Sequence, residues 1–287
     1  MKKNSLFTII IVLSIILILL LVFLNFNKNK KNQKESESQT QVEISNDKLG
    51  IKEKYECNEL QYVSVGIEDL MQIYFNDYKT YALTNPKQAY ELLNKEYREK
   101  RFKDLDEYKL YISNNKEKIA SDNLEKYQIA VDDEKTRYIC LGKYENYYIF
   151  CENSVMDYSI ILDTYTIDQP EFIEKYDEAN EKGKCILNIE KVKQALNSGD
   201  YKYIYGKLNE QFKNKNYSTL SAFENYMKSN LNKYNKIEYK EFKNEGETYI
   251  YNVELTDLLG KTDKTINMQI LMQLKEDRDF VMSFSIK

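Results

Sequence analysis

The sequence predicts an α+β protein in which an N-terminal transmembrane helix is followed by two tandem domains, each with about three helices packed on a curved antiparallel sheet. Three observations predict this architecture. Residues 6–24 form an apolar run, and the helix-rich stretch 86–115 recurs from Tyr201 onward. After each copy of that stretch, the apolar residues change from helical spacing to alternation, which is the pattern of strands.

The apolar run is long enough to cross a membrane. Residues 6–24 are Leu, Ile, Val and Phe apart from two hydroxyl residues, and Asn25 and Phe26 extend the run. Its length of about 20 residues suffices for a hydrocarbon core of roughly 30 Å. The alternative is a cleaved signal peptide, but no small-residue cleavage site and no lipid-modified cysteine follow. We therefore expect residues 1–26 to be an uncleaved anchor.

The orientation of the anchor depends on two opposing signals. Lysines both precede and follow the run, and a positive-inside count would keep the rest of the chain in the cytoplasm. A short basic N-terminus followed at once by an apolar run is, however, how export signals begin, and large domains translocate largely regardless of charge. We expect a single-pass protein of the cell membrane whose C-terminal domains are extracytoplasmic.

The remaining chain divides into a linker and two domains. Residues 27–52 consist mainly of Lys, Asn, Gln, Glu and Ser with almost nothing to bury, so we expect a flexible linker. The first domain is predicted over 53–168 and the second over 169–287. Both have enough apolar and aromatic residues for a packed core.

The two domains are predicted to be copies of one unit, because self-similarity at a fixed period indicates a repeated structure. A second echo lies further along, where VMDYSI (155–160) matches VMSFSI (281–286). Within the helical stretch the matches share one constant offset: Tyr90 with Tyr205, Leu93 with Leu208, Asn94 with Asn209, Tyr97 with Phe212, Leu105 with Leu220, and Tyr111 with Tyr226.

In the first unit, an apolar stripe at helical spacing predicts a helix over 67–82. Asn85 and Pro86 end it and start a second helix. Asp104 and Glu107 have the spacing of a capping box, which predicts a third, short helix. The strands that follow are predicted at 124–131, 136–141, 147–151 and 155–167.

The second unit repeats this order. A cap is predicted at Asp168 to Glu171 with Pro170 in the first turn, and Ser198-Gly199 is predicted to stop the next helix. A hairpin turn is expected at 244–246. Clean alternation in the strands indicates an antiparallel sheet with one buried and one wetter face. These strands are predicted at 249–255, 266–274 and 280–286.

This order of elements, with its Tyr-rich second helix, resembles the nuclear transport factor 2-like (cystatin-like) superfamily. The resemblance covers both units, about 65–168 and 168–287, and rests on element order and domain length. It implies three helices in the concavity of each curved sheet. Tandem cystatin-like domains on a membrane anchor are similar to extracytoplasmic assembly proteins of low-GC Gram-positive bacteria, among them bitopic components of conjugative type IV secretion systems.

Composition excludes several function classes. The 42 basic and 46 acidic residues give a net charge of −4, which argues against nucleic-acid binding. The chain has no histidine, so catalytic triads and HExxH zinc sites are excluded. The basic run at 95–103 is interleaved with glutamates and is interpreted as a solvated face. We expect no catalytic residue, no cofactor and no metal.

Two kinds of side chain remain as candidates. If a two-residue turn falls at Glu145-Asn146, Cys140 and Cys151 lie opposite each other on adjacent strands, and a disulfide is possible outside the cell. The alternative is two core residues with free thiols. Some members of the superfamily use an aspartate as general base. Asp157 lies beside the repeated motif, but its counterpart by that motif is Ser283, so we nominate no base.

The leading hypothesis is a membrane-anchored, non-catalytic extracytoplasmic module for interaction or assembly. It contacts membrane lipid through the N-terminal helix and an unidentified protein partner, and binds no nucleic acid or metal. Binding of a small ligand or peptide in the concave pocket of one domain is the alternative. A carboxylate-based isomerase or dehydratase is the third. An open pocket with an inward polar group favours the last two, and a concavity plugged by aromatic side chains favours the first.

Overall fold

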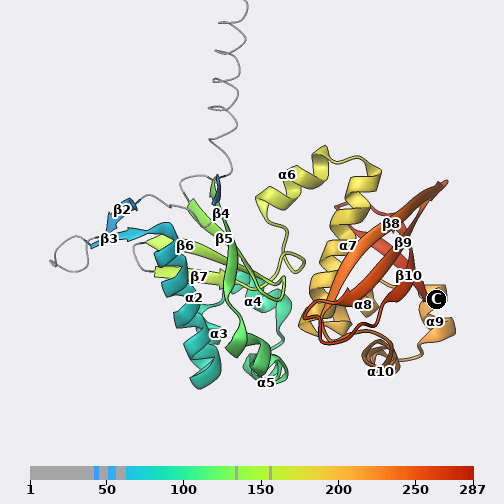
Figure 1. Cartoon of the computed structure of the whole chain (residues 1–287), viewed down its shortest axis with the longest axis horizontal. Helices are drawn as coiled ribbons and strands as arrows, with labels where there is room; N and C mark the ends of the chain where they lie inside the picture. The colour runs from blue at the N-terminus through green and yellow to red at the C-terminus, as the bar shows by residue number, and fades with distance from the viewer. Residues whose placement is uncertain (1–41, 45–50, 56–62, 133–134, 155–156) are drawn as a thin grey trace, which may run out of the picture.

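The computed structural model describes residues 42–44, 51–55, 63–132, 135–154 and 157–287. It is a mixed α+β structure with two antiparallel four-stranded meanders, the first extended by a short fifth strand. Figure 1 shows the two sheets side by side, with helix α7 between them. No helix in the described part of the chain is long and apolar enough to cross a bilayer. The predicted anchor, 1–26, lies outside the described residues.

The first half of the structure runs to Asp168. Its sheet has the strand order β1-β4-β5-β6-β7, and β2 and β3 form a separate hairpin. Its elements are β1 (Val42–Ile44), β2 (Ile51–Tyr55), β3 (Val63–Gly66), α2 (Ile67–Thr84), α3 (Pro86–Leu92), α4 (Lys95–Arg101), α5 (Leu105–Ser121), β4 (Leu124–Asp132), β5 (Lys135–Gly142), β6 (Tyr147–Ser154) and β7 (Asp157–Ile161).

The second half begins after Asp168, and its sheet has the order β11-β10-β9-β8. Its elements are α6 (Pro170–Glu178), α7 (Glu181–Ser198), α8 (Tyr201–Gly206), α9 (Glu210–Asn216), α10 (Leu220–Asn230), β8 (Asn235–Glu245), β9 (Thr248–Asp257), β10 (Ile266–Leu274) and β11 (Phe280–Ile286). All neighbouring strands of the sheet are antiparallel.

The helices α2, α3, α4 and α5 of the first half recur in the same order as α7, α8, α9 and α10, whereas α6 has no described counterpart. Helices α2 and α7 each have 18 residues. Asn94 and Asn209 cap α4 and α9 in the same way, since each side chain accepts a backbone N–H from the first turn. Each also donates its own backbone N–H to the last strand of its sheet, Asn94 to Ile160 O at 2.9 Å and Asn209 to Met282 O at 2.7 Å.

These last two bonds show that the echo between 155–160 and 281–286 does not mark equivalent positions. In the motif, Ile160 matches Ile286, whereas in the structure Leu93 bridges to Ile160 and Leu208 bridges to Met282. The two alignments differ by four residues. Because side chains alternate with period two along a strand, a shift of four keeps each residue on the same face, so a similar apolar pattern recurs out of register.

The first half has four helices where about three were expected. The predicted second helix is divided at Leu93 and Asn94, because Leu93 adopts an extended backbone, φ −64° and ψ 139°. The third helix is also longer than expected, with 17 residues. The extended residues allow the backbone to pair with Ile160 of β7 before helix α4 begins. The spacing of apolar residues in the sequence does not indicate this contact.

The predicted helix boundaries fare differently. Asp104 caps α5 by accepting the N–H groups of Asp106 and Glu107, but Glu107 receives the N–H of Lys103 and not that of Asp104. Gly199 ends α7 with φ 74°, a left-handed conformation that suits glycine. The cap predicted at Asp168 is wrong, because Gln169 holds that position without a side-chain bond and Pro170 opens α6.

The predicted linker and strands also need correction. Residues 42–44 lie within the linker expected over 27–52, yet they pair with 127–129 of β4. The strand predicted over 155–167 is β7, which ends at Ile161. The residues after it, 163–168, carry polar side chains that form hydrogen bonds and ion pairs where the two halves meet.

Each half has its own hydrophobic core. The first contains many fully buried aromatic rings, among them Tyr74, Phe75, Tyr78, Phe102 and Phe150. Its tyrosine hydroxyls find partners, as when Tyr108 donates to Tyr78 at 3.2 Å, because a buried hydroxyl without a partner is costly. The second core is richer in Met and begins at Tyr165.

The shared caps give a matched test of the duplication. Asn94→Ala and Asn209→Ala should each lower the free energy of unfolding by about 1 kcal/mol, because each removes the acceptor of a first-turn N–H. Urea denaturation followed by tyrosine fluorescence measures the change. The exposed Asn114→Ala, within α5, is the control and should stay within about 0.5 kcal/mol. An effect at one cap and none at the other would contradict the equivalence.

Candidate functional site at the junction of the two halves

The two halves meet along helix α7, and the burial of this helix shows it. Ten of its 18 residues are buried, against seven of 18 in its counterpart α2. One face of α7 carries the apolar residues Ile189, Val192 and Leu196 of the second core. The opposite face carries buried polar residues that contact the first half. A helix buried on both sides connects two bodies by packing as well as by the chain.

The centre of the junction is the guanidinium of Arg101, at the end of α4. Its side chain is 11% exposed and lies 3.8 Å from the Asp163 carboxylate and 3.3 Å from that of Asp200. It also stacks on Phe102 at 4.7 Å and on Tyr111 at 5.6 Å. Arg101 thereby joins α4 of the first half to the N-cap residue of α8 in the second.

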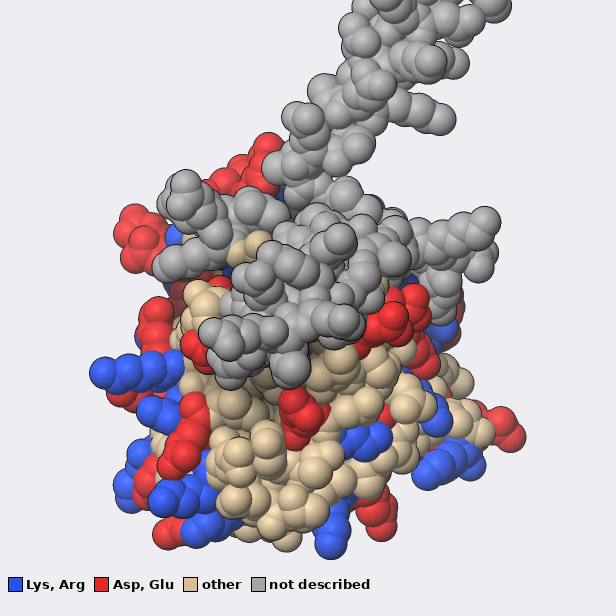
Figure 2. Space-filling view, turned by 90° about the vertical axis from the view of Figure 1, so that its left-hand side faces the viewer, with Lys and Arg blue, Asp and Glu red and all other residues tan. Residues whose placement is uncertain are grey.

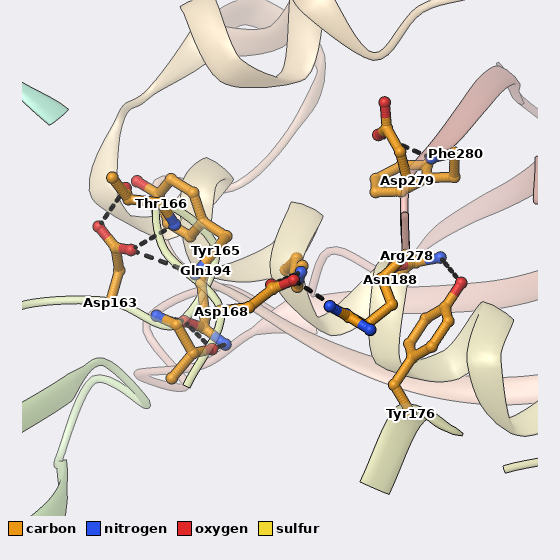
Figure 3. A network of polar contacts seen from close by, with 12 residues as sticks. Asp163, Tyr165, Thr166, Asp168, Tyr176, Asn188, Gln194, Arg278, Asp279 and Phe280 are labelled. Carbon is orange, nitrogen blue, oxygen red and sulfur yellow. Dashed lines mark hydrogen bonds and ion pairs between the residues drawn. The ribbon is translucent and has the colours of Figure 1, made fainter. Parts of the chain in front are cut away.

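Asp163 is the most heavily bonded group of this cluster. It accepts the hydroxyl of Tyr97 at 2.8 Å and the backbone N–H and hydroxyl of Thr166. Burial raises the pKa of the Asp163 carboxyl, while Arg101 and these hydrogen bonds act to lower it. Figure 3 shows Asp163 with Tyr165 and Thr166, beside the contact of Gln194 with residue 164. A buried carboxylate with this many donors is structural and has no free oxygen for a substrate.

Two donors from α5 bind the C-terminal carbonyls of α7. Lys118 Nζ donates to Asn197 O at 3.2 Å, and Asn115 Nδ2 donates to Ser198 O at 3.4 Å. Cations are favoured at helix C-termini, where carbonyl groups lack partners. Burial lowers the pKa of Lys118 to about 8, although the Asp122 carboxyl acts in the opposite direction.

Ion pairs surround this centre. Arg137 of β5 meets Glu171 of α6 at 2.6 Å, and Lys193 of α7 meets Glu145 of the β5–β6 turn at 2.9 Å. Asp168, at the boundary of the halves, binds Lys191 at 2.7 Å. It also binds Arg278 of the β10–β11 turn at 3.3 Å, and Figure 3 shows this contact.

Two hollows lie at the junction. The first, about 490 Å³, lies between α5 and α10, and Leu110, which is 59% exposed, lies among its lining residues. The second, about 530 Å³, is lined by charged pairs such as Lys191 with Asp168 and Lys207 with Asp279. Neither enters the space between helices and sheet in either half.

The cone of each half, meaning the space between its helices and the concave face of its sheet, is filled by side chains. In the second half the remaining hollow is only about 30 Å³, whereas ligand pockets hold about 300–1,000 Å³. In the first half, fully buried tyrosine and phenylalanine rings occupy the same space.

The predicted disulfide does not match the strand register. Cys140 lies opposite Tyr148, and Cys151 lies opposite Arg137. The two cysteines are therefore offset by three positions, because the β5–β6 turn is centred on Tyr144, earlier in the chain than the assumed Glu145-Asn146 turn. Cys140 is buried with a free thiol, and burial raises its pKa.

The predicted counterpart of Asp157 is also wrong. By the bridges at Ile160 and Met282, Asp157 corresponds to Asp279 and not to Ser283. Asp157 is exposed, and Asp279 pairs with Lys207 at 2.6 Å. The described residues contain no group of His, Cys, Asp or Glu that could hold a metal.

The sequence did not point to Arg101 as a buried residue. It belongs to the basic run at 95–103, in which Lys100 is exposed beside Glu96 and Arg98 is partly buried against Tyr90. One feature of the sequence could have indicated its burial: Arg101 directly precedes Phe102, an aromatic residue that is buried in the core at the end of α4. Opposite charges also mingle on the face of the first half that Figure 2 shows, in keeping with the near-balanced composition.

Comparison with known proteins finds no relatives: no protein-family model matches the chain, and neither does any curated protein or solved structure.

Removing the Arg101 charge should be strongly destabilising. Arg101→Met leaves Asp163 and Asp200 buried without their cation, and breaking a buried pair in this way costs about 3–5 kcal/mol. Urea denaturation of the full chain measures this loss. Lys100→Met, one residue away in an exposed pair, is the control and should cost at most about 1 kcal/mol. Equal effects of both variants would show that the Arg101 cluster does not hold the halves together.

Lys118 should give the protein a characteristic pH dependence. Between about pH 8 and pH 10 the unfolded chain keeps a proton on this lysine that the folded chain loses, so the free energy of unfolding rises with pH. Relative to Lys118→Met, the rise approaches about 1.4 kcal/mol per pH unit. Denaturation midpoints across this range measure it.

Lys193→Met is the control for that experiment. Burial opposes the charge of Lys193, but Glu190 and Glu145 raise its pKa, so both states keep its proton in this range. Its removal should lower stability without changing the slope. A wild-type slope equal to that of Lys118→Met would contradict the burial of a charged Lys118.

Proposed function

We propose that the chain is a non-catalytic module for interaction or assembly, anchored in the cell membrane by residues 1–26. Its two domains, 53–168 and 169–287, are proposed to be cystatin-like and extracytoplasmic. The observation that carries the proposal is that side chains fill the cone of each half, which leaves the outer surfaces for recognition.

The filled cones argue against binding inside either domain. A ligand in the second half would have to displace well-packed residues such as Met268, Ile270 and Phe284, which surround the hollow of about 30 Å³. Displacing such groups costs several kilocalories per mole, on the scale of core substitutions. Because each binding event would have to overcome this free-energy cost, the interior of the second half is poorly suited to bind a ligand.

The buried carboxylates argue against an acid–base enzyme. Asp122 is buried and accepts the Tyr148 hydroxyl at 2.8 Å, and Asp163 is bonded as described above. Neither lines the hollows at the junction. A general base must come within hydrogen-bond reach of a substrate proton, and these two groups are enclosed by their own partners.

The junction supports the assembly role in a further way. Buried ion pairs and polar contacts hold the two halves against α7, so together they present one continuous outer surface. A module that positions partners benefits from such a surface, because less ordering is needed when a partner binds.

Topology labelling tests the anchor and its orientation. In intact cells, a membrane-impermeant maleimide should label Leu110→Cys, because this position is 59% exposed on α5. Deletion of residues 1–26 should move the chain out of the membrane fraction. Wild-type chain, labelled in parallel, controls for the native cysteines. Labelling only after cell lysis would contradict the extracytoplasmic placement.

Crosslinking of the full chain in its native membrane then tests the assembly role. Specific protein neighbours should be recovered by mass spectrometry, and they should be lost when residues 1–26 are deleted. Recovery of a stoichiometric small molecule and no protein neighbour would instead support the ligand-binding alternative.

A further inference from the structure

Two outer strands, β7 and β11, contact other backbone within the described residues. Strand β7 is closed by Asn94, whose N–H binds Ile160 O, and β11 is closed by Asn209, whose N–H binds Met282 O. The three-residue strand β1 pairs with 127–129 of β4 and is the outer strand at the opposite side of the first sheet. The outer edge of β8 pairs with no strand of the described chain. An open edge offers unpaired N–H and C=O groups to another strand.

Strand β8 is long and amphipathic. It has 11 residues, and its core-facing side chains Ile237, Tyr239 and Phe242 are only half-buried, in contrast to the buried residues of β9. An adjoining strand would bring further apolar side chains beside them. The other face carries an alternating series of exposed charges: Lys236, Glu238, Lys240, Glu241, Lys243 and Glu245.

A bulge decides which of these charges share a face. The register of β8 with β9 shifts between Tyr239 and Glu241, so Lys240 is the extra residue. Before the bulge the even-numbered residues face solvent, and after it the odd-numbered residues do. Because of this change, the first part of β8 in one copy can pair antiparallel with the last part of β8 in a second copy about a twofold axis. In that arrangement all the charged side chains lie on the solvent face of the sheet.

We propose that β8 pairs antiparallel with β8 of a second copy, about a twofold axis between Lys240 and Glu241. In this register Lys236 of one copy faces Glu245 of the other, and Glu238 faces Lys243. At the axis Lys240 faces Glu241. On the core side, Tyr239 faces Phe242. Symmetry makes each of these pairs occur twice, and the two meanders join into one sheet of eight strands.

The charges select this register against its neighbours. A slip by two residues in one direction sets Lys236 against Lys243 and Glu238 against Glu241. The slip in the other direction sets Glu238 against Glu245 and Lys240 against Lys243. Like charges directly opposite are destabilising in sheets, and opposite charges and aromatic pairs are stabilising. A slip by one residue would place charges on the core side.

Lysines and bulges are also devices that block edge pairing, so a monomer with a protected edge is the competing outcome. The salt bridges that these charged residues form within one copy do not prevent dimer formation. Lys243 and Glu241 are both exposed within their pair, as are Lys240 and Glu238. Exposed pairs contribute little, and they can be exchanged for pairs across the axis.

Charge reversal tests the proposal with the full chain in detergent micelles. Wild type should show a concentration-dependent monomer–dimer equilibrium in sedimentation velocity. Lys243→Glu creates two like-charge contacts with Glu238 and should weaken the dimer about tenfold or more. The double variant E238K/K243E restores opposite charges and should recover the wild-type affinity. Lys87→Glu, on exposed α3, is the matched control and should have no effect.

Cysteine pairs test the register independently. E238C together with K243C should form a disulfide-linked dimer under mild oxidation, whereas K87C together with E91C should form no more than wild type. A wild-type chain that stays monomeric overturns the proposal, and so does a dimer that charge reversal does not weaken or charge exchange does not restore. Because the measurement needs neither the native membrane nor a partner protein, its failure is distinct from failure of the proposed function.

Discussion

The ion pairs of one largely enclosed cation, Arg101, are the interaction on which the arrangement of the two halves depends. This cation reaches Asp163 and Asp200 only because α4 ends where it does, and α4 starts late because Leu93 is extended. A buried guanidinium is tolerated when carboxylates and aromatic faces replace its water. Asp163, Asp200, Phe102 and Tyr111 supply these groups. Arg101 thereby links α4 of the first half to Asp200, the N-cap residue of α8 in the second half.

The same junction explains how two copies of one unit came to differ. Asn115 and Asn230 occupy equivalent positions, and each donates to the carbonyl four residues earlier, in Tyr111 and Tyr226. Asn115 also binds Ser198 across the junction. The repeated bond thus belongs to the unit, and the second bond belongs to the assembly of units.

Much of the fold could be predicted because it depends on local patterns. Helix α2, the stop at Gly199 and the alternating strands β9 and β10 follow from apolar spacing and backbone preference. The break at Leu93 and the burial of Arg101 could not, because each depends on a partner distant in the sequence, and the place of the β5–β6 turn could not, because several turn placements fit the same strand pattern. The disulfide prediction failed for this reason: a strand register read from one hairpin is uncertain by the length of its turn.

The filled cones and the open edge of β8 are two consequences of one physical constraint. A sheet must cover both its concave face and its edges, and the chain has only its own helices and short bridges for the task. In the first half large aromatic rings occupy the concave side, and in the second half apolar side chains leave a hollow of only about 30 Å³ there. The bridges beside Asn94 and Asn209 contact one outer strand of each four-stranded meander, β7 and β11. What the described chain leaves uncovered on β8 is backbone, and backbone pairing is satisfied best by another strand.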